Sequence, residues 1–167
     1  VLLITASLFS VRILFAETTY YVNENGNDQN SGETWLEAFE TIQQAVELAK
    51  AGDQIMLGHG EYRQSVKSVR AGKLEAPIRI SGVGNVEIRG DDQSRIIEIN
   101  HSHIILEGVK INGKTGDGNK ASSYRDKLVY IMGQDRDGVK GVKILNVELS
   151  KAGGECIRLK YFAKQNE

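Results

Sequence analysis

The hydrophobic pattern of segment 95–113, RIIEINHSHIILEGVKING, predicts short strands with very little chain between them. Apolar side chains alternate around Glu98, around Ile105 and around Lys110, which gives three runs in one short segment. Such runs are too short for helices, and no two-residue hairpin turn separates them. The pattern therefore predicts one coil of a solenoid, in which a strand bends, continues and bends again.

The same pattern recurs along the chain, with loops of unequal length between the repeats. Segment 103–112 aligns with segment 141–150 through its apolar positions. The repeats share a sharp corner before their third strand, and the residues predicted at this corner are Gly108, Asn85 and Asn146. A sharp bend requires a positive φ, which Gly adopts freely and Asn adopts better than most residues.

One helix is predicted over residues 41–51. Thr41 is followed three residues later by Gln44, which is the spacing of a capping box, and Gly52 is placed to end the helix. One face of this segment is apolar. We expect the helix to cover the end of the first coil, because a terminal repeat would otherwise expose its apolar interior. A helix that binds a partner is the alternative.

The composition is consistent with one domain that has a substantial core. The chain of 167 residues is 40% hydrophobic and 26% charged, and its 18 glycines suit a fold with many tight corners. The net charge of −1, without a stripe of Lys and Arg, argues against nucleic acid as a partner. Cys156 is the only cysteine, which excludes an internal disulfide framework.

Residues 1–16, VLLITASLFSVRILFA, are predicted to be part of a signal peptide, because an apolar run ends at a small residue before the polar Glu17. Export would place the protein outside the cell or in the periplasm. A single membrane anchor is the alternative, but Arg12 leaves the run short of a spanning helix, so no stable anchor is expected. The N-terminal strand, loop and capping helix then occupy residues 17–53, and the first solenoid coils occupy residues 54–167.

The loop at 23–32 is dense in Asn, Asp and Gly. Oxygen atoms of Glu24, Asn25 and Asp28 could approach a calcium ion, but the EF-hand spacing is absent. A plain turn is therefore the favoured interpretation of this loop.

Four segments carry a family resemblance: YYVNENGNDQNSG, FETIQQAVELAKAGDQIML, GEYRQSV and APIRISG, in that order. Together they resemble the N-terminal portion of the pectate-lyase-like, right-handed parallel β-helix superfamily, which includes extracellular polysaccharide lyases. The resemblance implies an all-β solenoid with three parallel sheets. The first sheet would contain the strands around Ile55, Ile97, Val129 and Ile157, the second those around Ile78, Ile104 and Val142, and the third those around Val86, Val109 and Val147.

The resemblance also implies where a substrate would lie, since β-helix lyases bind theirs on the outer surface of the first sheet. The outward positions on successive strands would be Met56, Glu98, Tyr130 and Arg158, and the long loop at 114–127 leads into this sheet. We predict that a groove for an acidic, uronic-acid polysaccharide includes Glu98, Tyr130, Arg158, Lys160, Tyr124 and Arg125. Arg would pair with sugar carboxylates, and Tyr would pack against a sugar ring. The alternative is that these are solvated positions without a ligand.

Catalytic residues are not identified by the sequence. Lyases of this family use calcium or a cationic residue to acidify the proton next to a uronate carboxylate, and a Lys or Arg is often the base. No carboxylate cluster recurs on neighbouring first-sheet strands, so calcium is implied only by the resemblance and no metal ligands are assigned. A hydrolase would need a second carboxylate near Glu98, but Tyr130 occupies that position on the next coil.

The prediction for the whole is a secreted, carbohydrate-active β-helix protein, similar to a polysaccharide lyase and monomeric at full length. Segment 153–167 begins a fourth coil, so we expect further coils, and with them the active site, in a longer protein. A non-catalytic β-helix that binds glycans or serves in the cell envelope is the alternative function.

Overall fold

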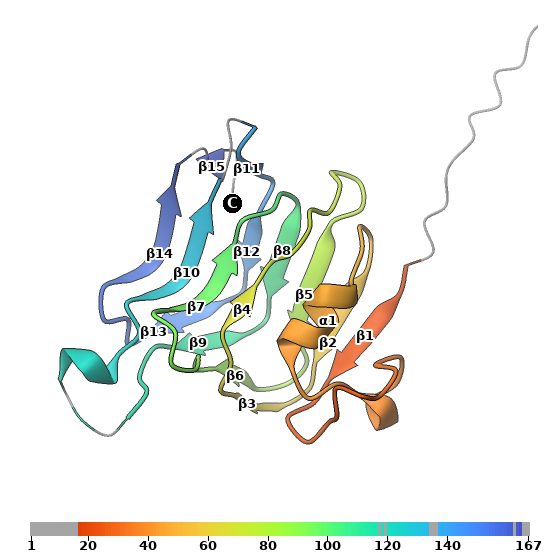
Figure 1. Cartoon of the computed structure of the whole chain (residues 1–167), viewed down its shortest axis with the longest axis horizontal. Helices are drawn as coiled ribbons and strands as arrows, with labels where there is room; N and C mark the ends of the chain where they lie inside the picture. The colour runs from red at the N-terminus through yellow and green to blue at the C-terminus, as the bar shows by residue number, and fades with distance from the viewer. Residues whose placement is uncertain (1–16, 117, 119, 134–136, 162, 165–167) are drawn as a thin grey trace, which may run out of the picture.

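The computed structural model describes residues 17–116, 118, 120–133, 137–161 and 163–164. Its parallel strands wind into a solenoid of three sheets around one apolar interior (Figure 1). The predicted all-β, right-handed parallel β-helix with an N-terminal capping helix is therefore confirmed. The signal peptide predicted for residues 1–16 lies outside the described residues.

Each sheet takes one strand from each successive coil. The first sheet has the order β14-β10-β7-β4, with β4 Val66–Lys67, β7 Arg95–Ile99, β10 Lys127–Met132 and β14 Glu155–Lys160. The second has the order β1-β2-β5-β8-β12, with β1 Thr19–Val22, β2 Gln54–Leu57, β5 Ile78–Gly82, β8 Ile104–Glu107 and β12 Lys143–Leu145. The third has the order β13-β9-β6-β3, with β3 Gly60–Tyr62, β6 Val86–Ile88, β9 Lys110–Asn112 and β13 Glu148–Ser150. A short pair, β11 Val139–Lys140 and β15 Ala163–Lys164, lies beside them.

The strands stack in register, so that equivalent inward side chains form aliphatic rows about 4.8 Å apart. The row of the second sheet runs through Ile55, Ile80, Leu106 and Ile144. Leu106 faces Ile144, as the alignment of segment 103–112 with segment 141–150 requires. The repeat read from the sequence is therefore the structural repeat.

The predicted membership of the first sheet was wrong at one strand. Ile55 lies in β2, which pairs with β1 and β5 in the second sheet. The first-sheet neighbour of Ile97 is Val66, from the two-residue strand β4. A strand of two residues shows no alternation in the sequence, so β4 could not be recognised. The alternation around Ile55 fits a strand of the first sheet as well as it fits a strand of the second.

The corner between the second and third sheets has positive φ angles at two of the three predicted residues. Gly108 has φ 66° and Asn146 has φ 52°, in agreement with the prediction. The prediction for Asn85 was wrong, because the neighbouring Gly84 adopts φ 80° instead. Glycine adopts this conformation without the steric cost that a Cβ brings, so the bend falls one residue earlier.

Helix α1 (Ile42–Leu48) begins where the capping box predicts. The Thr41 side chain accepts a hydrogen bond from the Gln44 N–H at 3.2 Å. The helix ends at Leu48, because Ala49 already has an extended ψ of 136°. Its buried residues, Ile42, Ala45 and Val46, face the solenoid, and α1 contacts β1, β2 and β4.

The loop at 23–32 behaves as a turn that is fastened to its neighbours. The Asp28 carboxylate accepts hydrogen bonds from the Glu40 and Thr41 N–H groups at 2.9 and 2.8 Å. Glu24 accepts one from the Glu61 N–H at 2.8 Å. Asp28 thus fastens the loop to the start of α1, and Glu24 fastens it to β3.

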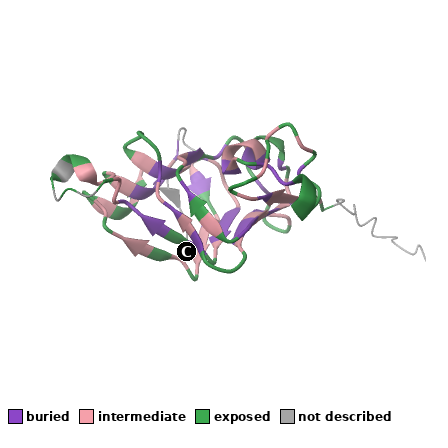
Figure 2. Ribbon diagram, turned by 90° about the horizontal axis from the view of Figure 1, so that it is seen from below, coloured by how far each residue is buried: buried purple, intermediate pink, exposed green. Residues whose placement is uncertain are grey.

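Buried residues line the interior, and exposed residues gather in the turns (Figure 2). The strands of the last coil, β12, β13 and β14, contain only intermediate and exposed residues. In β14, the inward Ile157 and Leu159 remain 40% and 53% exposed, because no described strand stacks on them. No helix among the described residues has the length and apolar character needed to cross a membrane.

Candidate functional site

The outer surface of the first sheet carries a row of polar side chains from four adjacent strands. Glu98, Tyr130 and Arg158 are neighbours in register, as the sequence predicts. On the strand of the preceding coil, Lys67 is in register with Glu98, whereas the sequence analysis assigned Met56 to this position. This correction follows from the reassignment of β2, and it replaces a thioether with a cation.

Glu98 is held by cations and an amide on the outer surface. Its carboxylate accepts hydrogen bonds from Arg95 Nη1 at 2.7 Å and from Asn100 Nδ2 at 2.8 Å, and Lys67 Nζ lies 3.4 Å away. Partial burial opposes the charged form, but the hydrogen bonds from Asn100 and Arg95 and the charges of Lys67 and Arg95 outweigh it, so the pKa of Glu98 is lowered. The carboxylate is therefore ionised at neutral pH.

Tyr130 is covered by Arg95. The guanidinium carbon of Arg95 lies 3.9 Å from the centre of the Tyr130 ring, and Tyr130 is only 3% exposed. Its hydroxyl donates to Met132 Sδ at 3.4 Å. Arg95, not Tyr130, therefore faces solvent at this position. A sugar ring could pack against Tyr130 only if Arg95 moved.

The two cations of β14 lie at the edge of the described sheet. Arg158 forms an ion pair with Glu155 at 2.5 Å and is partly exposed. Lys160 stands opposite Met132 and lies 4.6 Å from the centre of the Tyr161 ring. Both side chains can reach a ligand that crosses the sheet.

Tyr124 and Arg125 lie at the entrance to β10 rather than beside Tyr130. Tyr124 forms a backbone bridge with Lys114, which closes the loop that contains η2 (Ala121–Ser123), at the lower left of Figure 1. Arg125 Nη2 lies 3.7 Å from the Asp92 carboxylate, in the loop that precedes β7. The structure thus brings these two residues to the rim of the surface.

A hollow of about 340 Å³ opens beside Glu98, between β4 and the loop that leads into β7. Its polar lining residues are Ser65, Lys67, Asp91, Gln93, Ser94, Arg95 and Glu98. Ser65 Oγ donates to Asp91 at 2.6 Å, and the Gln93 N–H donates to the same carboxylate at 2.9 Å. Partial burial raises the pKa of Asp91, but these hydrogen bonds outweigh it and lower the pKa.

Sequence reasoning missed this hollow because its residues come from a two-residue strand and an irregular loop. Arg95 was within the segment that defined the repeat, yet its position before the first inward isoleucine gave no sign that its side chain reaches over Tyr130. The only available signal was the polar run at 91–95 directly before a strand.

Charge distinguishes this sheet from the rest of the chain. Its four strands contain five cationic side chains, Lys67, Arg95, Lys127, Arg158 and Lys160, and two anionic ones, Glu98 and Glu155. The difference, 5 − 2 = 3, is an excess of positive charge on the strands themselves, whereas the whole chain carries −1. Anionic ligands are attracted to such a surface. The adjoining loops add the carboxylates of Asp91, Asp92 and Asp126 beside these strands.

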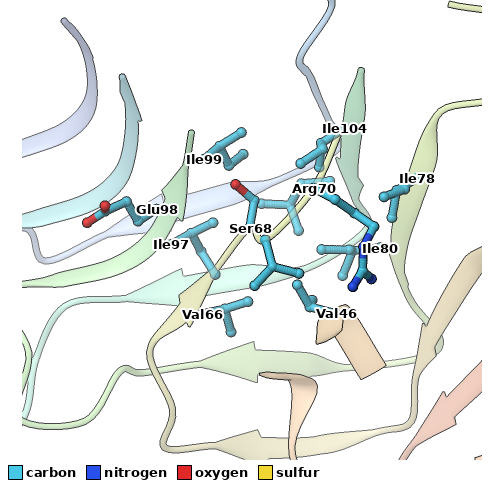
Figure 3. Close-up of a pocket in the computed structure, with 12 residues that line it drawn as sticks. Val46, Val66, Ser68, Arg70, Ile78, Ile80, Ile97, Glu98, Ile99 and Ile104 are labelled. Carbon is cyan, nitrogen blue, oxygen red and sulfur yellow. The ribbon is translucent and has the colours of Figure 1, made fainter. Parts of the chain in front are cut away.

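The other side of β7 is apolar. A small cavity of about 20 Å³ lies inside the solenoid between α1 and the strands, and it is lined mostly by isoleucine and valine side chains (Figure 3). Figure 3 shows Ile97 and Ile99 on this inner side, whereas the Glu98 carboxylate points away from it. The alternation of β7 therefore separates a hydrophobic interior from the polar outer surface.

Among the described residues, no group of three or more His, Cys, Asp and Glu side chains could hold a metal ion. Glu98, the central carboxylate of the surface, is already bound by Arg95, Lys67 and Asn100. The donor set of the described surface therefore does not fit the calcium ion that the resemblance implies.

Replacing Glu98 with Gln should lower the free energy of unfolding by about 1–2 kcal/mol at neutral pH, because Arg95 and Lys67 lose a charged partner. The folded-state pKa of Glu98 is lowered, so the unfolded chain binds this proton first. The stabilisation is present above the ordinary carboxyl range and is lost as the pH falls below about 4.3 towards the lowered pKa. Urea unfolding at several pH values should therefore show the two proteins converging in acid.

Glu75→Gln is the matched control, because Glu75 is an exposed carboxylate in a turn before β5. It should leave the stability within about 0.5 kcal/mol of the parent at every pH. A constant difference between Glu98→Gln and the parent across the acid range would contradict the proposed ionisation of Glu98.

The fold and this surface define a pectate-lyase-like parallel β-helix with a polar, cationic outer surface on its first sheet. Three solved structures share the fold. A GH136 lacto-N-biosidase from Eubacterium ramulus is 18% identical with a TM-score of 0.72, over 90% of this chain and 31% of that one. The pectate lyase Pel9A is 17% identical with a TM-score of 0.61, over 80% and 33%. A rhamnogalacturonan lyase is 17% identical with a TM-score of 0.52, over 80% and 37%.

The family described as "Protein of unknown function (DUF1565)" matches residues 24–166, and the chain belongs to this family. A curated relative, "Uncharacterized protein YwoF" of Bacillus subtilis (strain 168), is 29% identical over 122 residues. The match covers 68% of this chain and 25% of that protein, so the chain spans about a quarter of the length of this relative.

Proposed function

We propose that the outer surface of the first sheet binds an acidic polysaccharide, and that the chain is part of a carbohydrate-active β-helix protein. The observation that carries this proposal is the concentration of five cationic against two anionic side chains on four adjacent strands. A uronic-acid polymer presents carboxylates at regular intervals, and a cationic surface attracts it over several ångströms.

The cations of this surface can exchange partners. Lys67 is 60% exposed and Arg158 is 41% exposed, and their ion pairs with Glu98 and Glu155 lie at the surface. Exposed ion pairs contribute at most about 1 kcal/mol, so a sugar carboxylate can compete for either cation. Arg158 adds a planar fork that matches a carboxylate with two hydrogen bonds.

The hollow beside Glu98 supplies groups for sugar hydroxyls. Ser65, Asp91 and Gln93 contribute a hydroxyl, a carboxylate and an amide at its rim. Carbohydrate as the ligand class is further supported by the names of the three solved structures, two lyases and a biosidase. Export, as predicted from residues 1–16, would bring this surface to polysaccharides outside the cell.

Within this proposal, a lyase-like reaction of the full-length protein on a uronic-acid polymer is the first candidate. Non-catalytic glycan binding is the second, and the state of Glu98 favours it for the described coils. Its lowered pKa makes the carboxylate a weak base at neutral pH, and its partners already occupy its oxygens. Incubating the full-length protein with pectate and alginate, and measuring unsaturated-uronate absorbance, separates the two candidates.

Replacing both Lys67 and Arg158 with Ala should weaken the binding of polygalacturonate about tenfold, because two charge-assisted contacts are lost. Affinity electrophoresis in gels that contain polygalacturonate measures the retardation directly. The retardation of the parent should also fall with added salt, since the contacts are exposed.

The matched control replaces Lys110 and Arg63 with Ala, which removes the same charge from the third-sheet side of the solenoid. This variant should keep the retardation of the parent. Equal losses in both double variants would show that only net charge matters, and the proposal of a specific surface would then be wrong.

A further inference from the structure

The corner between the second and third sheets forms a second surface, on another side of the solenoid. Successive coils turn there at Gly58, at Gly84, at Gly108 and at Asn146. Backbone hydrogen bonds join neighbouring coils at these turns, with the Val83 N–H donating to Leu57 at 2.8 Å and the Gly108 N–H donating to Leu145 at 3.1 Å. The turns therefore form one continuous line along the solenoid axis.

A groove of about 170 Å³ follows the last three of these turns, at Gly84, Gly108 and Asn146, and we call it the corner groove. It is lined by Gly84, Asn85, Gly108, Lys110, Asn146 and Glu148. The two glycines contribute no side chains to the groove, whose lining also includes Val86 and Val109, and Asn85 and Asn146 are exposed beside it. Lys110 and Glu148 face each other in register, so their charges cancel across the groove.

An aromatic side chain stands at the N-terminal end of the same line. Trp35, in the short helix η1 (Trp35–Glu37), is 44% exposed, and its ring centre lies 4.7 Å from that of Tyr21 with an interplanar angle of 58°. A Cβ on Gly58 would lie 3.1 Å from Trp35 Cζ3 and 3.3 Å from Asn23 Nδ2. The indole therefore lies over the first turn of the line, held by Tyr21 and close to an amide.

We propose that the corner groove and Trp35 bind a neutral oligosaccharide, which extends along the solenoid axis. One sugar ring packs against the exposed indole face, because the C–H groups of a pyranose are complementary to an aromatic surface. Hydroxyls of the following units bond to the amides of Asn85 and Asn146, which can both donate and accept. From Gly58 to Asn146 there are three strand spacings, or roughly 14 Å, which accommodates a short linear chain.

The ligand is uncharged rather than anionic, because carboxylates outnumber cations among the strand residues beside the groove. Lys110 is flanked in register by Glu87 and Glu148, so an anionic sugar finds no excess of cations there. The first sheet, in contrast, has an excess of positive charge. The two surfaces thus differ in ligand, and this inference does not depend on the function proposed for the first sheet.

Trp35 is the only tryptophan of the chain, so its fluorescence reports directly on this site. The test titrates the protein with cellohexaose, xylohexaose and chitohexaose, and calorimetry runs in parallel. We expect a saturable fluorescence change with one or more of them. Trp35→Ala should abolish the binding heat, and circular dichroism should show that this exposed position leaves the fold intact.

Two further variants test the groove itself. Asn146→Gly keeps a residue that adopts the positive φ and removes only the amide, and Asn85→Ala removes the other one. Each should weaken binding about fivefold, the effect of one hydrogen bond. The double variant Lys67→Ala and Arg158→Ala on the first sheet should bind these sugars as the parent does.

Three results would overturn the inference. The first is the absence of any saturable response to the neutral sugars, and the second is an equal response to oligogalacturonate or to a flexible Gly-Ser peptide. The third is unchanged affinity in both asparagine variants, which would leave the groove without a role.

Discussion

Replacing Leu106 with Ala is expected to lower the free energy of unfolding by about 2–5 kcal/mol. Leu106 is 1% exposed and lies in register between Ile80 and Ile144, in the middle of the second-sheet row. It also lines the interior cavity of about 20 Å³, so truncation would enlarge an existing void. The strands cannot close that void, because backbone hydrogen bonds hold them at a set spacing.

Urea unfolding followed by far-ultraviolet circular dichroism measures this effect. Leu74→Ala is the matched control, since it removes the same atoms from a side chain that is 73% exposed. The control should change stability by less than about 0.5 kcal/mol. Losses of similar size in both variants would contradict the tight packing of the interior.

Replacing Gly82 with Ala should lower the free energy of unfolding by about 1–3 kcal/mol, the range typical of overpacking. A Cβ at this position would lie 2.3 Å from the carbonyl oxygen of Gly108 on the next coil. That backbone has little freedom to move, because the Gly108 N–H is itself bonded to Leu145. The added methyl group must therefore push two coils apart or bend the end of β5.

Thermal unfolding of Gly82→Ala should show a lower midpoint than the parent. Gly116→Ala is the control, because a Cβ on Gly116 meets no atom within 4 Å. This substitution in an exposed loop should leave the midpoint unchanged, or raise it slightly because the unfolded chain loses entropy. An unchanged midpoint for Gly82→Ala would mean that the coils are spaced more loosely than the structure shows.

The repeat was predictable because strand side chains alternate with a period of two and stacked coils place the same position on the same side. Leu106 faces Ile144 and Gly108 corresponds to Asn146, as the aligned segments indicate. The start of α1 was predictable for a local reason as well, since Thr41 and Gln44 are only three residues apart.

The composition of the candidate site was only partly predictable. Glu98, Tyr130 and Arg158 follow from the repeat, because they occupy one position in three similar strands. Lys67 does not, since β4 is too short to show alternation. The coverage of Tyr130 by Arg95 could not be predicted either, because a long side chain can lie over its neighbour or extend into water without any change in the pattern.

By itself, the sequence determined the coil, the capping helix and the inward or outward direction of most strand residues, because these depend on local periodicity and on short-range hydrogen bonds. Only the tertiary structure decided that β2 belongs to the second sheet, and that Lys67, Arg95 and the loop around Asp91 surround Glu98. Sheet membership depends on backbone hydrogen bonds between coils, and every strand offers the same backbone groups to its neighbours. The composition of the surface proposed to bind a ligand therefore follows from how the coils stack.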